Sequence, residues 1–361
     1  MKKQILIATI SDYGNLGNRL QNYAVNESLK RYGTVTGGMC RSHFYWEYLL
    51  KLKIMKFPNI PYLSKKLWGK RYKKYLFWNF SSRISVTKQY FDHNEETISK
   101  NFKWIFYGSD QIWNPEFGLK NCIIPKTPKE KNIAICASIG TDYIPEERTK
   151  EYKDGLLKFR YISVREDRAA EIVNNLIGVK PEVLIDPTLA LDRQKWEKIE
   201  RRPYYGSAKE WKKKKYILIY FLGNLSQVRW AQIKKLVEKN NAEAIDATKG
   251  KIANDIGPAE FIWLIHHSYM VITDSYHGSI FSFLFNKAFY VLDREDDEIK
   301  LSMNSRFDTL FRKLNLYDRR NNNIDTFMEE HDYRHSYELL EKEKKKYFAF
   351  IYKVMESADK R

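Results

Sequence analysis

The strongest candidate for a chemical role in the sequence is an imidazole placed between a predicted strand and a predicted helix. His277 follows the apolar run 269–273 and precedes an apolar stretch, opened by Gly278 and Ser279, that is typical of a buried helix. The N-terminus of such a helix binds anions through free N–H groups and its dipole. We therefore predict a site in which Ser275, Gly278 and Ser279 bind an anion while His277 transfers protons. The alternative is an ordinary helix cap with a structural histidine.

Two arginines could bind the same kind of anion. Arg165 comes directly after the apolar run 161–164, at what we expect to be the carboxyl end of a buried strand. A guanidinium there can place two parallel N–H groups on a carboxylate or a phosphate. The alternative is an ion pair with the neighbouring Glu166 or Asp167. Arg306 is a second expected anion contact, after the last predicted strand.

Two further loops carry polar side chains, and the aromatic residues of the first could stack on the face of a sugar. Residues 106–115 bring hydroxyl, carboxylate and amide groups together, and Asp110 is a candidate base there. Residues 11–19 form a glycine-bearing loop, but they lack both the G-x-G-x-x-G pattern and the P-loop lysine of nucleotide sites. The alternative for the first loop is a capped turn with Trp113 in the core. The residues expected to contact an acceptor are Asn15, Asn18, Gln111, Trp113 and Asn114.

Length and composition predict a globular protein of two domains. The chain has 361 residues, of which 43% are hydrophobic and 15% aromatic, enough for substantial cores. The apolar run near the N-terminus is too short for a signal peptide, and no run reaches the roughly 20 residues that cross a bilayer. Cys40, Cys122 and Cys136 fit neither a disulfide framework nor a zinc site. We therefore expect a cytoplasmic location.

The formal net charge of +18 predicts an anionic partner. Much of the excess lies in clusters at residues 51–74, 212–215 and 342–346. The first cluster contains interleaved Trp and Tyr residues, so we hypothesise a peripheral contact with the inner face of an anionic membrane. The alternative is solvated surface. Because the sequence contains no recognisable nucleic-acid-binding module, we expect no nucleic acid partner.

Short apolar runs alternate with amphipathic stretches, the pattern of parallel sheets wrapped by helices. The pattern occurs twice and predicts an α/β protein with two Rossmann-like domains facing across a cleft. In such folds ligands bind beyond the carboxyl ends of the strands, where the loops above lie. The predicted divisions are an N-terminal domain at 1–191 with a basic, aromatic helical excursion at 41–100, a linker at 192–215, a C-terminal domain at 216–330, and a helix at 331–361 packing back across both domains.

Together these loops resemble the polysaccharide pyruvyl transferase family. The matching segments follow the family's order and span about residues 5–310. Segments 108–114 and 273–278 together are the most specific sign of the family, and each of the other segments is weak evidence alone. The segments are 14–18 (GNLGN), 108–114 (GSDQIWN), 163–166 (SVRE), 186–188 (DPT), 273–278 (TDSYHG) and 304–306 (NSR).

The resemblance implies a fold like that of the GT-B glycosyltransferases. It also implies transfer of the carboxyethylidene group of phosphoenolpyruvate onto two hydroxyls of a sugar, giving a cyclic ketal. The acceptor would belong to a cell-surface polysaccharide or its lipid-linked precursor. The family's donor-site arginine and histidine would correspond to Arg165 and His277. Many members carry an acidic residue where this chain has Asn18, so we assign no acid–base role there.

The implied reaction needs no metal and no cofactor, and phosphoenolpyruvate serves as the donor substrate. The adjacent His266 and His267 are expected to point to different faces of a helix, so they predict no metal site. The main alternative function is a glycosyltransferase of the same fold that uses a nucleotide sugar. A nucleic-acid binder and a non-catalytic glycan binder are further alternatives.

Overall fold

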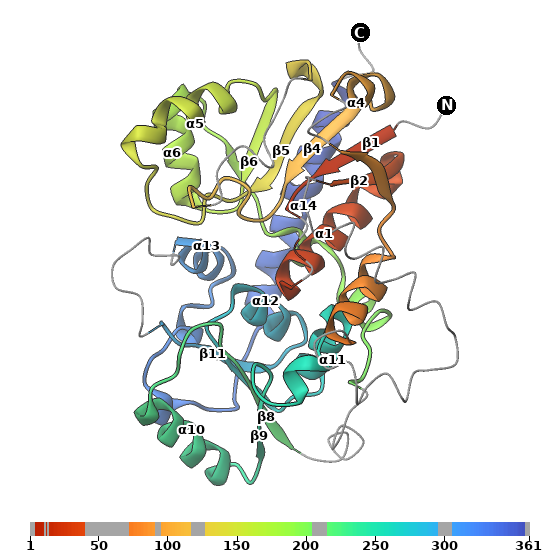
Figure 1. The fold of residues 1–361 in the computed structure, drawn as a ribbon. Helices are drawn as coiled ribbons and strands as arrows, with labels where there is room; N and C mark the ends of the chain where they lie inside the picture. The colour runs from red at the N-terminus through yellow and green to blue at the C-terminus, as the bar shows by residue number, and fades with distance from the viewer. Residues whose placement is uncertain are drawn as a thin grey trace, which may run out of the picture.

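The computed structural model describes residues 4–10, 12, 14–39, 72–90, 95–116, 127–203, 215–294 and 305–357. Figure 1 shows two parallel sheets, one above the other, each flanked by helices. This is the predicted pair of Rossmann-like units. The predictions for Cys40, Cys122, Asn304 and most of the basic clusters at 51–74 and 212–215 lie outside the described residues.

The first sheet has seven strands in the order β3-β2-β1-β4-β5-β6-β7, and every pair is parallel. Strands β4 and β5 are fully buried, as expected for a sheet with helices on both faces. The strand order reverses between β1 and β4, which creates a topological switch point there. The strands are β1 (Gln4–Ala8), β2 (Thr34–Met39), β3 (Val86–Tyr90), β4 (Trp104–Gly108), β5 (Asn132–Ala137), β6 (Tyr161–Val164) and β7 (Glu182–Val183).

The second sheet has four parallel strands in the order β11-β10-β8-β9. Its switch point lies between β8 and β10. Because ligands bind beyond the carboxyl ends of strands at such points, each sheet supplies one natural side of a site. The strands are β8 (Tyr216–Tyr220), β9 (Glu243–Asp246), β10 (Met270–Thr273) and β11 (Ala288–Val291).

Helices cover both sheets and join them. Residues 72–81 are also helical. The named helices are α1 (Leu16–Leu29), α4 (Glu95–Asn101), α5 (Thr149–Leu156), α6 (Asp167–Ile177), α7 (Pro187–Ala190), α8 (Arg193–Glu197), α10 (Gln227–Lys239), α11 (Pro258–His266), α12 (Tyr276–Leu284), α13 (Ser305–Leu314) and α14 (Arg334–Glu356).

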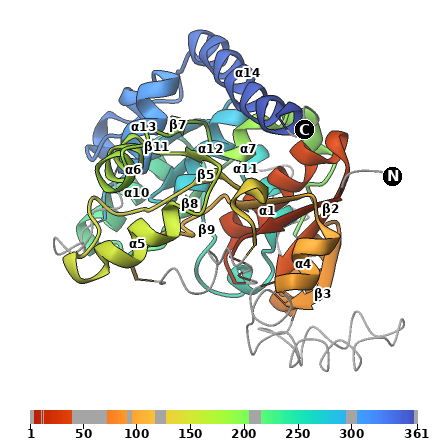
Figure 2. The same cartoon turned by 90° about the horizontal axis from the view of Figure 1, so that it is seen from above.

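The last helix, α14, lies along one edge of the molecule when it is seen from above (Figure 2). Near its start, Tyr337 stacks on Phe283 of α12, and its hydroxyl donates to the Phe283 carbonyl at 2.8 Å. Near its end, Lys353 pairs with Glu182 of β7 at 3.2 Å. The helix therefore contacts elements of the C-terminal and the N-terminal sheet, which is the placement predicted for it.

Helix α12 begins earlier than the sequence indicated. Ser275 is its N-cap, and its side chain accepts a hydrogen bond from the Gly278 amide. The helix starts at Tyr276 rather than at Gly278, so His277 lies within the first turn. All nine of its residues are buried. This agrees with the prediction of a fully buried helix.

The described part of the helical excursion predicted at 41–100 contains helices at 72–81 and 95–101, and it also contains a strand that was not predicted. Of its described part, residues 86–90 form β3 at the edge of the first sheet, beside β2. Neither strand was predicted, because TVTGGM contains two glycines and VTKQY is mostly polar. Such sequences form edge strands when a neighbouring strand supplies the pairing.

The described part of the predicted linker at 192–215 is packed against the protein. It contains helix α8, whose Trp196 is fully buried and meets Phe281 of α12 edge-on. Arg201 pairs with the buried Glu260 of α11. The linker was predicted from the polar, basic sequence of this region, whereas the buried Trp196 attaches its described part to the core.

The basic cluster at 342–346 is partly neutralised within the protein. Lys344 pairs with Asp192 and Glu341, and Lys346 pairs with Glu343. Within the ranges that the structure describes, no helix has both the length and the apolar character to cross a membrane.

Candidate active site

The residues predicted to bind an anion come together where the two sheets face each other. The loops after β4, β6 and β7 bring Asp110, Arg165 and Asp186 from the first unit. The first turn of α12, after β10, brings His277 from the second. Asp186 Oδ2 lies 2.8 Å from Arg165 Nη1 and 3.8 Å from His277 Nε2, so one carboxylate joins the two groups. Arg165 and His277 therefore converge, as the sequence analysis required.

Arg165 is a buried guanidinium with spare hydrogen-bonding capacity. Its side chain has no exposed surface, and Nη1 donates to Asp186 Oδ2. Nε and Nη2 are buried and have no hydrogen-bond partner. They lie 3.7 Å from Glu166 Oε2 and 3.7 Å from Asp110 Oδ1, beyond hydrogen-bond reach. Burial opposes the charge, but the surrounding Asp186, Tyr276, Asp110 and Glu166 outweigh it and raise the pKa of Arg165.

His277 also carries an unused ring nitrogen. Its Nε2 is buried without a hydrogen-bond partner and faces Asp186. Burial lowers the pKa of His277 below its usual value, and Arg165 and Arg306 act in the same direction. Asp186 and Asp110 act in the opposite direction but do not outweigh burial. The imidazole is therefore neutral at pH 7.

The other side of the His277 ring rests on Gly17, in the first turn of α1. A Cβ at position 17 would lie 2.7 Å from His277 Cγ and closer still to Nδ1. Only a glycine leaves room for the imidazole here. The glycine-bearing loop thus serves the site by close approach of its backbone to the histidine.

Tyr276 and Arg306 complete the enclosed side of the site. The Arg165 guanidinium lies 5.0 Å and that of Arg306 5.5 Å from the centroid of the Tyr276 ring, both within cation–π range. Burial, followed by the nearby Arg165 charge, lowers the pKa of Arg306 to about 10. It therefore stays charged at pH 7, and the structure brings Arg306 to the predicted anion site.

Asp186 is the central residue that the sequence analysis did not assign. It caps α7 and accepts hydrogen bonds from Thr188 N at 3.0 Å and Thr188 Oγ1 at 2.6 Å. Burial favours its neutral form, but His277 and Arg165 outweigh burial and lower the pKa of Asp186. The only signal for it was the DPT segment at 186–188, which was quoted for family likeness without a role.

Asp110 lies at the more open edge of the site, with 15% of its side chain exposed. Its Oδ2 accepts from Asn18 Nδ2 at 2.6 Å, and its Oδ1 accepts from the Gln111 amide at 2.9 Å. Its backbone has a φ of 71°, uncommon for a residue other than glycine. The buried Asn18 also donates to the Ile10 carbonyl. Asn18 therefore orients the Asp110 carboxylate.

Asn15 and the residues around the α12 cap have local structural contacts. Asn15 caps α1, and its side chain accepts from the Asn18 amide. Ser275 accepts from the Gly278 amide. The Ser279 hydroxyl donates to the Tyr276 carbonyl at 2.8 Å, and Ser279 is fully buried. The prediction that this hydroxyl points into the site is therefore wrong. The Ser275 and Ser279 side chains are thus engaged within α12, and the part of this segment that could still bind an anion is the first turn of the helix.

Three predicted acceptor contacts lie outside the site or at its edge. Trp113 is fully buried and meets Phe159 edge-on, so it offers no face to a sugar, and the capped-turn alternative holds for it. Asn114 is also fully buried, and its Oδ1 accepts from the Glu116 amide. Large aromatic side chains are drawn into cores by the area they bury. Gln111 packs on Gly140, where a Cβ would come within 2.8 Å of Gln111 Cδ.

Glu166 shapes one wall by ordering the loop after β5. Its Oε1 accepts from Ser138 Oγ and from the amides of Ile139 and Gly140, at 2.8–3.0 Å. Glu166 is therefore a structural carboxylate beside Arg165. Glu166 Oε2 also lies 3.7 Å from Arg165 Nε, so the ion pair that was the alternative for Arg165 is present beside the closer pair with Asp186.

A cluster of potential metal ligands lies away from this site. Glu200, His266 and His267 have ligand atoms within 4.8 Å of one another. The two rings lie 4.7 Å apart, contrary to the prediction of opposite faces, because His267 is the C-cap beyond the end of α11. Both His266 nitrogens are engaged, with Glu200 at 2.8 Å and Arg193 at 3.3 Å. The hydrogen bonds explain the cluster without a metal.

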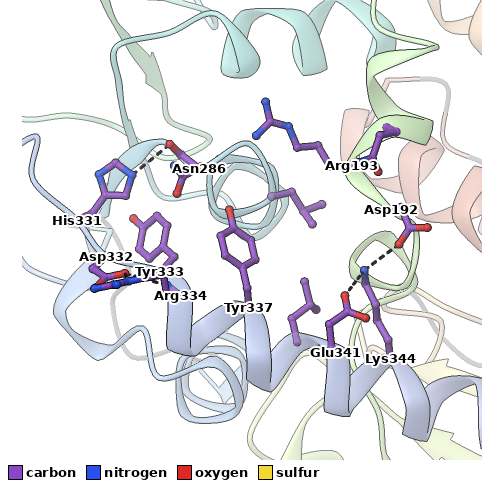
Figure 3. Close-up of a pocket in the computed structure, with 13 residues that line it drawn as sticks. Asp192, Arg193, Asn286, His331, Asp332, Tyr333, Arg334, Tyr337, Glu341 and Lys344 are labelled. Carbon is purple, nitrogen blue, oxygen red and sulfur yellow. Dashed lines mark hydrogen bonds and ion pairs between the residues drawn. The ribbon is translucent and has the colours of Figure 1, made fainter.

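A surface pocket of about 570 Å³ lies at the opposite end of α12 from His277. Figure 3 shows it between α14, α8 and the end of α12, with Tyr337 at its centre and Lys344 joining Asp192 and Glu341 at one rim. Its charged groups are already paired: Lys344 with Asp192 and Glu341, Arg334 with Asp332, and Arg193 with the neighbouring Glu197. We do not assign the candidate chemistry to it.

Comparison with protein families gives a match to the model described as "Polysaccharide pyruvyl transferase", over residues 15–296. The match covers most of the chain and includes Asp110, Arg165, Asp186 and His277. A comparison with curated proteins returns no match.

A comparison with solved structures finds several that are similar to this chain at low sequence identity. A UDP-N-acetylglucosamine 2-epimerase from Rickettsia bellii has a TM-score of 0.48 at 10% identity, covering 99% of this chain and 98% of that one. The S. aureus MnaA–UDP co-structure has a TM-score of 0.47 at 10% identity, covering 86% and 82%. A UDP-glucosyltransferase from Polygonum tinctorium has a TM-score of 0.39 at 11% identity, covering 99% and 94%. We draw no functional conclusion from these likenesses.

Proposed function

The chain belongs to the polysaccharide pyruvyl transferase family, and we propose that it moves the carboxyethylidene group of phosphoenolpyruvate onto two hydroxyls of a sugar. The sugar would be part of a cell-surface polysaccharide or its lipid-linked precursor. The products are a cyclic ketal and inorganic phosphate. No metal or cofactor takes part in this proposal.

One observation carries the proposal. Arg165 Nε and Nη2 and His277 Nε2 are buried donors or acceptors without hydrogen-bond partners, and Asp186 joins the two side chains. Leaving such groups unsatisfied costs about 1–3 kcal/mol each. Native proteins seldom accept that cost unless a ligand supplies the missing partner. A small molecule with carboxylate and phosphate oxygens has the acceptors that this guanidinium lacks.

The chemistry requires a proton donor at the methylene carbon of phosphoenolpyruvate. Protonating that carbon makes a methyl group and leaves C2 electron-deficient. One sugar hydroxyl adds its oxygen to C2 and loses its proton. The C2–O bond to phosphate then breaks, and the second hydroxyl closes the ring and loses its own proton. One of the two hydroxyl protons balances the proton taken by the methylene carbon, and the other leaves with phosphate.

We assign the proton transfer at the methylene carbon to His277 and the binding of the anionic groups to Arg165. Arg306 and the first turn of α12 hold negative charge on the same side. The side chains of Arg165 and Asp186 have no exposed surface, whereas 11% of His277 and 15% of Asp110 are exposed. The donor would therefore occupy the enclosed side, and the sugar would approach from the edge with His277 and Asp110.

Asp110 is the candidate base for an acceptor hydroxyl. It is a carboxylate at the open edge, held by Asn18 and by the Gln111 amide. A base must lie within hydrogen-bond reach of the proton it removes, and the exposed edge offers that access. Asn18 and Gln111 would contact the acceptor beside it.

The main alternative is a glycosyltransferase that uses a nucleotide sugar. The hydrogen bonds at the switch point of the second sheet disfavour it. The Leu222 and Gly223 amides, directly after β8, both donate to the Asp274 carboxylate, at 2.7 and 2.8 Å. Arg294 Nε donates to the same carboxylate at 2.7 Å. The N–H groups and the cation that would suit a nucleotide phosphate are thus already occupied by Asp274.

The cellular setting belongs to the same proposal. Phosphoenolpyruvate is an intracellular metabolite, so we place the reaction in the cytoplasm. A lipid-linked acceptor would bring it to the inner face of a membrane. Sedimentation with vesicles tests this point: equal binding to neutral and anionic vesicles would remove the electrostatic membrane contact from the proposal.

The function is tested by supplying phosphoenolpyruvate with a panel of cell-surface glycan intermediates. We expect phosphate release that depends on both substrates, and a glycan product heavier by one carboxyethylidene group. UDP-, GDP- and CMP-sugars are tested in parallel with the same acceptors. Turnover of a nucleotide sugar without use of phosphoenolpyruvate would overturn the proposal in favour of the glycosyltransferase.

A further inference from the structure

The charges around His277 are unusual for a site that binds an anion. Facing the ring are Asp110 after β4, Arg165 after β6, Asp186 after β7, and Arg306 on α13, with the Tyr276 ring edge-on to it. Glu166 lies beside Arg165 in the same cluster. Among these described groups, two guanidiniums meet three carboxylates. With His277 neutral the cluster has a net negative charge, so a phosphate-bearing anion meets repulsion as well as hydrogen-bond donors.

We propose that the anionic donor and a proton enter this site together, with His277 taking up the proton at Nε2 as the anion binds beside Arg165. Asp186 is the positioning residue that links the anion-binding guanidinium to the imidazole that takes up the proton. Its carboxylate contacts Arg165 Nη1 at 2.8 Å and lies 3.8 Å from His277 Nε2. The inference rests on the proposed donor site.

The ligand-free ring is held neutral by its surroundings. His277 Nε2 is buried and donates to no acceptor, so nothing hydrogen-bonds a proton there. Asp186 is close but 3.8 Å away, and it already accepts from Arg165 and Thr188. Burial lowers the pKa of His277, and the two guanidiniums act in the same direction. The ring is therefore deprotonated until another negative charge arrives.

A bound anion supplies that charge. An opposite charge within about 4–6 Å raises the pKa of a histidine by roughly 1–3 units. The same anion also offsets the effect of Arg165, which otherwise disfavours a charged ring. Binding of the donor would thus create the imidazolium that the proposed reaction needs at the methylene carbon. The acid is present only when its substrate is present.

The test measures proton uptake directly and needs no turnover. Isothermal titration calorimetry is run in buffers of different ionisation enthalpy, with sulfate as the first probe and phosphoenolpyruvate as the second. Sulfate does not titrate near neutral pH, so a buffer-dependent enthalpy reports protons bound by the protein. We expect uptake approaching about one proton per anion at pH 7.5–8. Because proton uptake and the pH dependence of binding are linked, we also expect the anion affinity to fall toward tenfold per pH unit within that same range.

Three variants identify the group and the role of the carboxylate. His277→Asn should bind sulfate without uptake. His335→Asn, on the exposed face of α14, is the matched control and should behave as wild type. Asp186→Asn should move the uptake to lower pH, because His277 loses a carboxylate that favours its charged form. A merely structural role for Asp186 would lower thermal stability and leave this pH dependence in place.

Several results would overturn the inference. Anion binding by the wild type with a buffer-independent enthalpy means that no proton enters with the anion. Unchanged uptake in His277→Asn assigns the proton elsewhere. If His277→Asn fails to fold, the histidine ring signals of the wild type are followed by NMR, and the absence of any ring that becomes charged on sulfate addition is decisive. If phosphoenolpyruvate binds without uptake, only this inference fails. If it does not bind at all, the proposed function fails.

Discussion

Gly17 and His277 are in direct contact across the two units of the protein. Gly17 is in the first turn of α1, beyond the switch point of the first sheet, and His277 is in the first turn of α12, beyond that of the second. A Cβ at position 17 would lie 2.7 Å from His277 Cγ. The position of the imidazole therefore depends on how closely the two helix N-termini approach.

Substituting Gly17 should displace the imidazole. In Gly17→Ala the new methyl group overlaps the ring, so either the ring or the helix must move. A misplacement of about 1 Å in an active site can cost about 10²-fold in rate, and we expect a loss of this size in phosphate release. Gly14→Ala is the matched control, because its Cβ would meet only the Asp12 carboxylate, at 3.2 Å. A folded Gly17→Ala protein with wild-type activity would refute the close contact.

Removing the imidazole should abolish most of the activity and leave the fold intact. In His277→Ala we expect phosphate release to fall at least ~100-fold, within the ~10²–10⁴-fold range of acid–base catalysis. The melting temperature should change little, because Nε2 makes no hydrogen bond that the fold would lose. His335→Ala serves as the control. A large drop in melting temperature with a proportionate drop in activity would instead support a structural histidine.

The apolar runs allowed most strands and the site's loops to be predicted. Residues 104–108 and 161–164 form strands at the predicted bounds, because continuous apolar runs between turn residues are typical of buried parallel strands. The polar loop after 269–273 lies at a switch point, as expected. The family assignment from these loops is confirmed by the match over residues 15–296.

Contacts between distant segments were not predictable from the sequence. Asp186 joins Arg165 to His277, yet these residues come from three segments far apart in the sequence and only the fold brings them together. Trp113 was expected at the acceptor, but its large apolar area places it in the core. Strand β3 was missed because its residues, VTKQY, lack an apolar run.

Arg165→Lys should weaken the use of the donor. An ammonium can keep the contact with Asp186, but it cannot present the planar N–H groups of Nε and Nη2. The loss of a hydrogen bond to a charged group costs about 1.5–3 kcal/mol, so we expect the KM for phosphoenolpyruvate to rise tenfold or more. Arg168→Lys is the matched control, since Arg168 is 42% exposed and pairs with Glu171. Unchanged donor kinetics in Arg165→Lys would exclude Arg165 from the donor site.

The buried, neutral His277 should make the ligand-free protein less stable in mild acid. Its pKa in the folded state is lowered below the usual value of about 6.5, whereas the unfolded chain has the ordinary value. Above pH 6.5 both states are neutral at this residue, and its contribution to stability is complete. As the pH falls below 6.5, the unfolded state binds the proton first, so stability is lost until the folded pKa is reached.

This loss can be isolated by comparing the wild type with His277→Asn. The free energy of unfolding, from urea denaturation, should fall more steeply for the wild type between pH 6.5 and 5, with an extra slope approaching about 1.4 kcal/mol per pH unit. His267, whose pKa burial also lowers, contributes equally to both proteins and cancels. In the wild type the pKa of Asp186 is below its ordinary value near 3.8, so its effect is lost only at lower pH. In His277→Asn the carboxylate keeps its contacts with Arg165 and Thr188, which favour its charged form. Parallel stability curves for the two proteins would mean that His277 is charged in the folded state or solvated as in the unfolded chain.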